Sequence, residues 1–190
     1  YTPGGIFAAF NKAQMHELTG QKALWERFGH TGLELLDSNG IREQIQSEVY
    51  VGGMLDRSGG HVHPLNLLLG EAAAFESLGG SLYEDSKVID IVRSEKPVIK
   101  TVQGQVTANY VLLAGNAYMD GLIPELAAKS MPCGTQVVAT GVLDESVAGS
   151  LIPNHYCVED CNYLLDYYRV TGDNRLLYGG GVTYGGGDPA

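Results

Sequence analysis

Two tyrosines and an arginine near the end of the chain have the types and spacing of a small-molecule site. If residues 162–170 form a strand, alternation places Tyr163, Tyr167 and Arg169 on one face. A guanidinium can hold a carboxylate, while tyrosine rings pack against an alkyl chain. We therefore predict that Tyr167 and Arg169 bind substrate. A solvent-facing amphipathic strand would show the same pattern, so the pattern alone leaves both interpretations open.

A second candidate site follows the apolar run at residues 110–114. Such a run is typical of a parallel strand buried on both faces, and ligands of open α/β sheets bind at the carboxyl ends of such strands. The small residues Ala114 and Gly115 would let the backbone approach a cofactor closely. The alternative is an ordinary exit from a strand into a turn.

Motifs for phosphates and metals are missing or incomplete. The glycine run at residues 179–185 does not fit the dinucleotide fingerprint G-x-G-x-x-G. His61 with His63, and His155 with Cys157 and Cys161, include no C-x-x-C pair, and no third ligand lies near the two histidines. We therefore predict no metal site.

The composition is that of a globular protein, and its charge argues against nucleic acid as the main partner. Lysine and arginine number 12 against 22 aspartates and glutamates, so the net charge is −10. Phosphate binding needs a basic stripe, whereas an acidic field attracts cations such as amines or simply keeps a protein soluble. No apolar run approaches the ~20 residues of a membrane span, so we predict neither a nucleic-acid partner nor a membrane partner. Three cysteines, an odd number, argue against a closed disulfide framework and favour a reducing, cytoplasmic compartment.

The periodicity predicts an α+β fold, with a mixed, mostly antiparallel sheet and flanking helices. A helix over 11–29 begins at Asn11 as its N-cap, and Pro64 begins another that ends at Gly79 and Gly80. A third helix covers 40–48, a fourth covers 144–151, and the glycine-rich segment 49–62 reads as a strand and a loop. Strands are expected at 4–10, 82–84, 87–93, 98–102, 106–107, 110–114, 134–143, 162–170 and 174–180.

From the residues at its two ends, we predict that the chain is a segment of a longer protein. It begins Tyr1-Thr2-Pro3 without a methionine and finishes in a glycine-rich run. We expect strand edges that missing segments would cover to be open to self-association.

Five stretches of the sequence resemble FAD-dependent amine oxidases of the D-amino-acid oxidase and sarcosine oxidase type. The most specific is 156–169, and the resemblance extends over the whole chain. The stretches are 59–66, 103–108, 114–118, 131–136 and 154–181.

The resemblance implies the middle of a longer enzyme, with 1–60 and 129–190 in its substrate domain and 61–128 in its FAD-binding domain. It implies that Val88 approaches the adenine of FAD, and that Ala114, Gly115 and Asn116 contact the cofactor. We add His61 to Tyr167 and Arg169 as a substrate-binding candidate. No catalytic residue is assigned.

The implied reaction is oxidation of a primary amine, that of gamma-glutamylputrescine, to an aldehyde with release of ammonia and hydrogen peroxide. Two alternatives remain open: the same flavin chemistry on another amine or amino acid, and a non-catalytic amine-binding module.

Overall fold

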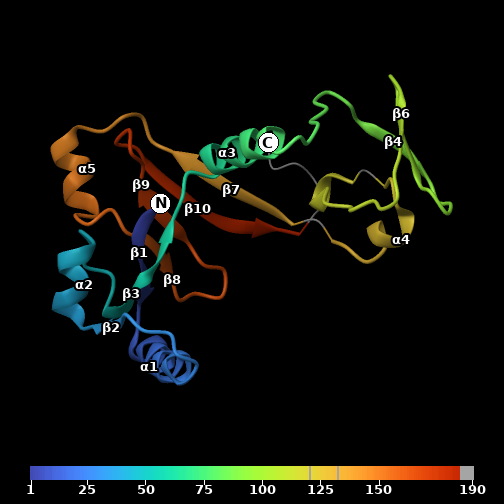
Figure 1. Cartoon of the computed structure of the whole chain (residues 1–190). Coiled ribbons are helices and arrows are strands. Elements are labelled where there is room, and N and C mark those ends of the chain that lie inside the picture. The colour runs from blue at the N-terminus through green and yellow to red at the C-terminus, as the bar shows by residue number, and fades with distance from the viewer. Residues whose placement is uncertain (120, 132, 185–190) are drawn as a thin grey trace. The chain divides into compact units, whose positions relative to one another are not determined.

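The computed structural model describes residues 1–119, 121–131 and 133–184, so the end of the glycine-rich run lies outside the described residues. The chain forms two compact units, each with its own sheet (Figure 1). The first unit joins Tyr1–Pro64 to Gly134–Thr183, and the second holds Leu65–Cys133.

A seven-stranded sheet with the order β2-β3-β1-β8-β9-β10-β7 organises the first unit. β1 pairs with β8 in parallel, and the other pairs are antiparallel, which confirms the mixed, mostly antiparallel sheet predicted above. The strands are β1 (Thr2–Ala9), β2 (Leu33–Leu36), β3 (Gly52–His61), β7 (Gly134–Ala139), β8 (Cys157–Asp160), β9 (Tyr167–Val170) and β10 (Leu176–Thr183).

Helices cover the sheet unequally. On one face, α2 (Ser38–Gln44) and α5 (Glu145–Leu151) bring Ile41 and Ala148 into the main core, which also holds Ile6, Val158 and Val170. On the other face, α1 (Lys12–Arg27) packs Leu18 against Met54 in a smaller cluster. The rest of that second face carries the pocket described below.

The predicted helix starts follow local capping chemistry. The side chain of Asn11 accepts a hydrogen bond from the backbone N–H of Gln14, as an N-cap should. Asp37 accepts from Asn39 and Gly40, so α2 begins at Ser38 rather than at residue 40, and it ends at Gln44 rather than at 48.

The second unit contains a small antiparallel sheet and short helices. Its strands follow the order β4-β5-β6. Its elements are α3 (Pro64–Ser77), whose first residue belongs to the first unit, β4 (Val88–Val92), β5 (Val98–Thr101), β6 (Gln105–Thr107), η1 (Asn116–Tyr118) and α4 (Pro124–Ala127).

The predicted strand at 110–114 is wrong. These residues belong to no helix or strand, and Tyr110 and Leu112 are 93% and 90% exposed. A parallel strand needs hydrogen-bonded neighbours, and none of the described residues pairs with this segment. The predicted strand at 82–84 is also absent, and residues 162–166 join β8 to β9 instead of extending β9.

The predicted loop around Gly59 and Gly60 is part of β3 instead. Gly60 lies opposite Pro3 of β1, and His61 lies opposite Thr2. A Cβ on Gly60 would lie 2.4 Å from the carbonyl oxygen of Thr2. The glycine is therefore needed for close approach of two strands rather than for loop flexibility.

Candidate functional site

A pocket of about 460 Å³ lies over the part of the second sheet face that α1 leaves uncovered. Phe7, Glu159, Tyr167 and Gly179 form one row across β1, β8, β9 and β10, because each is paired with the next. Residues opposite one another in neighbouring strands point to the same face. Phe7, Glu159 and Tyr167 all line the pocket, and so does Arg169, which shares their face two residues along β9.

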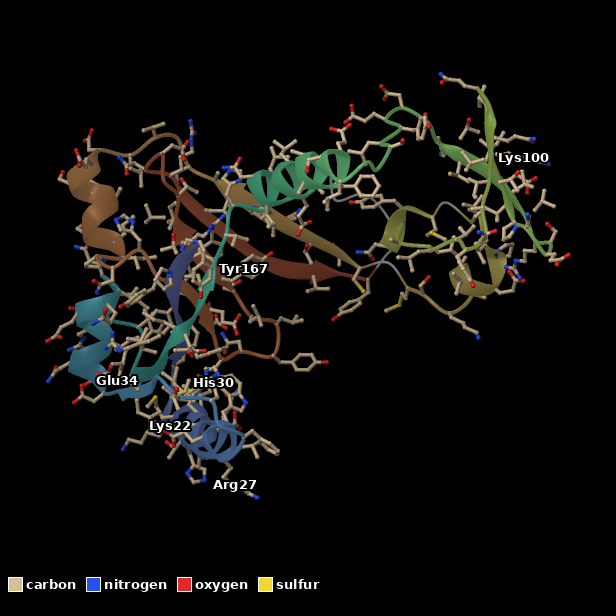
Figure 2. All side chains as sticks on the ribbon, viewed as in Figure 1. Lys22, Arg27, His30, Glu34, Lys100 and Tyr167 are labelled. Atoms are coloured by element: carbon tan, nitrogen blue, oxygen red, sulfur yellow. The ribbon has the colours of Figure 1, made fainter. Side chains whose placement is uncertain are left out.

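Glycine in β10 makes room for the ring of Tyr167. A Cβ on Gly179 would lie 2.3 Å from carbon atoms of that ring, so only glycine leaves the ring where it is. Tyr167 is 36% exposed and lies on the sheet surface (Figure 2). Part of the ring is therefore available to contact a bound molecule.

His61 and Arg169 meet at the pocket. A guanidinium can only donate, so Arg169 donates from one terminal nitrogen to Nδ1 of His61. Nε2 of His61 lies 3.0 Å from the carbonyl oxygen of His155, to which it must donate. The two hydrogen bonds require the neutral Nε2–H tautomer, and they orient the guanidinium at the pocket wall.

Asp56 is the first of two carboxylates on the pocket wall, and its partners are already in place. Its oxygens accept from the backbone N–H and hydroxyl of Ser58 at 2.9 and 2.8 Å, and one lies 3.0 Å from Nε2 of His30, near the end of α1 (Figure 2). Burial raises the pKa of Asp56, but hydrogen bonds from Ser58, Gly59 and His30 outweigh it and lower the pKa below its ordinary value.

Glu159 is the second carboxylate, and sequence reasoning missed it. Burial, followed by the charge of Asp160, raises the pKa of Glu159 above its ordinary value. It lies in β8, which was not predicted. The four residues of β8, Cys-Val-Glu-Asp, do not alternate between apolar and polar types, so the sequence carries no period-two signal for this strand.

Beneath the pocket floor, two hydroxyl groups tie the sheet to its core. Tyr168, on the opposite face of β9 from Tyr167, has its hydroxyl 2.9 Å from that of Tyr50. Burial, and then the hydrogen bond from Tyr50, raises the pKa of Tyr168. Both groups remain hydroxyls near neutral pH and hold β9 in place.

A second cavity, of about 730 Å³, lies within the second unit. Its lining includes Val88, Ala114 and Gly115, three of the four residues predicted to bind the cofactor. Asn116 follows directly with φ +46°, which turns the chain sharply at the end of this wall. The cavity brings β4 and the segment after residue 110 to one place, although that segment is not a strand.

These residues fit part of an FAD site. Aliphatic side chains from β4 and a backbone wall at Ala114 and Gly115 suit a flat ring system, and the chain lacks the glycine turn that binds the pyrophosphate. The assignment of Val88, Ala114, Gly115 and Asn116 to the cofactor stays a prediction.

Other candidates lie away from both cavities. Tyr163, predicted to share a face with Tyr167, is 98% exposed in the β8–β9 connection.

Within the described ranges, no three histidine, cysteine or acidic side chains are grouped as a metal site would require. No helix in the same ranges is long and apolar enough to cross a membrane.

Comparison with known proteins adds sequence evidence to this geometry. The family model described as "DAO: FAD dependent oxidoreductase" matches residues 1–190. The chain is 59% identical over 190 residues to "Gamma-glutamylputrescine oxidoreductase" of Escherichia coli K12, covering 100% of this chain and 45% of that protein. It is 39% identical over 178 residues to "Probable oxidoreductase OrdL" of Haemophilus influenzae, covering 90% of this chain and 41% of that protein. The chain thus spans less than half the length of these relatives.

Solved structures share the fold. Glycine oxidase from Geobacillus kaustophilus superposes with a TM-score of 0.77 and 24% identity, over 96% of this chain and 48% of that one. L-proline dehydrogenase from P. horikoshii superposes with a TM-score of 0.81 and 17% identity, over 98% and 50%. At these identities the likeness concerns the fold alone.

Proposed function

The chain belongs to the family of FAD-dependent oxidoreductases, and from this premise we propose that it forms the substrate pocket and part of the cofactor site of an amine oxidase acting on gamma-glutamylputrescine. The observation that carries the proposal is the pocket beside Arg169, where a cation and an aromatic ring face one cavity. The 59% identity to a relative named for this substrate supports the choice of substrate.

The chain's own residues would bind and orient the substrate. Arg169 would pair with the glutamyl carboxylate, His61 would hold the guanidinium in place, and Tyr167 would pack against the alkyl chain. When bound, FAD would supply the two-electron oxidation of the carbon bearing the primary amine. Water would be consumed in releasing ammonia and leaving the aldehyde, and dioxygen would take the two electrons to give hydrogen peroxide. Val88, Ala114, Gly115 and Asn116 would contact that cofactor.

The cavities assign no proton acceptor for the amine. Cys157 lines the substrate pocket, but burial raises its pKa above the ordinary value, so the thiol stays protonated near neutral pH. We therefore propose binding and orientation, and no acid–base step, for the residues of this chain.

Two wider proposals concern the setting of the enzyme. All three cysteines are free, which supports a reducing, cytoplasmic location. The edge strands β2 and β7 offer unpaired backbone on the outer sides of the sheet, where a second copy could pair.

Anaerobic reduction of the flavin in the complete protein tests the proposed function. Gamma-glutamylputrescine should bleach the flavin absorbance faster than putrescine, glycine, sarcosine or proline at equal concentration. Faster flavin reduction by an amino acid would support the first alternative, a flavin oxidase of another substrate. Tight amine binding without flavin reduction by any of these compounds would support the non-catalytic amine-binding module.

A further inference from the structure

Among the described residues, one carboxylate of the pocket wall has a side chain without a partner. Of the two acidic residues that line the pocket, Asp56 is engaged by Ser58 and His30, as described above. The side chain of Glu159 has no hydrogen bond or ion pair with any residue in the described part of the chain, although it is half-buried. It also borders a smaller hollow beside α1. A half-buried carboxylate is costly to leave unpaired, which makes it a site for a ligand's cation.

Arg169 lies at a suitable distance from this carboxylate. Glu159 is paired with Tyr167, and Arg169 is two residues further along the same face of β9. Diagonal neighbours of this kind have Cβ atoms roughly 7–8 Å apart. Charged hydrogen bonds of about 2.8 Å at each end would let one α-amino acid group, which carries both charges on one carbon, span the two side chains.

We propose that Glu159 determines specificity by binding the α-ammonium group of a substrate whose α-carboxylate is held by Arg169. The proposal rests on the proposed function in one respect, since a gamma-glutamyl group ends in such an α-amino acid. The reactive amine at the other end of the substrate is then free to reach the cofactor.

The electrostatics of the pocket agree with this role. Burial and the charge of Asp160 both raise the pKa of Glu159, so its charged form lacks stabilisation in the free protein. An ammonium group beside it would favour the ionised carboxylate. Arg169 does not fill this role, because its guanidinium is directed at His61.

Two ligands that lack the reactive terminal amine test the proposal by anaerobic calorimetry on the complete, FAD-loaded protein. Gamma-glutamylbutylamide keeps the α-ammonium and α-carboxylate but lacks the terminal amine of the alkyl chain. Glutaric acid monobutylamide keeps the carboxylate and lacks both amines. The first should bind about 10- to 100-fold more tightly than the second, as expected for one charged hydrogen bond.

Substitution then assigns the preference to one residue. Glu159→Gln should weaken the binding of gamma-glutamylbutylamide by the same factor. It should change the affinity for glutaric acid monobutylamide by less than twofold. Glu43→Gln makes the same chemical change on an exposed residue of α2, which covers the opposite face of the sheet, and should change neither.

The possible results separate this proposal from the proposed function. Equal binding of the two ligands by the unsubstituted protein overturns the proposal without any variant, and so does an equal loss of both ligands in Glu159→Gln. Discrimination between the ligands without oxidation of gamma-glutamylputrescine supports the proposal and overturns only the proposed function. Oxidation of gamma-glutamylputrescine without discrimination between the two ligands supports the proposed function and overturns the proposal for Glu159.

Discussion

Arg169 donates a hydrogen bond to Nδ1 of His61, although the two residues are 108 positions apart in the sequence. The contact forms because β9 and the end of β3 border the same pocket on one face of the sheet. The far nitrogen of the ring is held by the carbonyl oxygen of His155. Arg169 therefore reaches the pocket wall in a defined orientation, which lowers the entropic cost of binding a carboxylate.

Arg169→Ala in the complete protein should raise the KM for gamma-glutamylputrescine about 10- to 100-fold, because a charged hydrogen bond contributes roughly 1.5–3 kcal/mol. Arg169→Lys should restore only part of the loss, since an ammonium cannot form two parallel hydrogen bonds. Steady-state peroxide production measures both. An unchanged KM would remove Arg169 from the substrate site.

His61→Ala should raise KM by a smaller factor, about 2- to 10-fold, because it removes one hydrogen bond that positions the guanidinium and leaves the guanidinium itself. His61→Asn can still accept from Arg169 and should recover most of the affinity. In an Arg169→Ala background, His61→Ala should change KM no further. An independent, additive effect in that double variant would contradict a positioning role.

Gly179→Ala should displace Tyr167 and weaken substrate binding several-fold, because the new Cβ would lie 2.3 Å from the ring. Gly172→Ala is the matched control, since no atom lies within 4 Å of its added Cβ. Inhibitor binding and the free energy of unfolding should be measured for both. If the two variants behave alike, the close contact between Gly179 and Tyr167 has no functional weight.

Asp56→Asn should lower the free energy of unfolding at pH 7 by about 1–2 kcal/mol, because it replaces a charged acceptor of several hydrogen bonds. The pKa of Asp56 is lowered in the folded protein, so its stabilisation is complete above the ordinary value near 4 and is lost progressively as the pH falls from there through the lowered pKa of the folded state. Urea denaturation between pH 7 and pH 3 should show the two proteins converging at the acid end. A difference that stays constant with pH would mean that the Asp56 charge contributes nothing.

Local features of the fold could be predicted because their causes lie within a few residues. Asn11 caps α1 through the backbone N–H three positions later, and Pro64 begins α3 as its fixed φ favours. Pairing between distant segments could not be predicted in the same way. Gly60 belongs to a strand because β1 lies against it, a fact that no pattern around residue 60 contains.

The residues that line the pocket on β8 and β9 were predicted in part for the same reason. Tyr167 and Arg169 alternate on one short strand, so their common face follows from spacing alone. Glu159 lies on a neighbouring strand of four residues whose residue types do not alternate between apolar and polar. Only the register between β8 and β9 places Glu159 beside Tyr167.

The sequence by itself determined the α+β class, the helix caps and Tyr167 and Arg169 as candidates, because these depend on residue types and short spacings. The family, and His61 as a further candidate, came from the resemblance of whole stretches of sequence to known enzymes. The tertiary structure decided which of these side chains meet, that Glu159 joins them, and that residues 110–114 form no strand. Those outcomes depend on hydrogen bonds between segments far apart in the chain. Bringing such segments together costs chain entropy, and the hydrogen bonds that offset this cost form only after the segments have met.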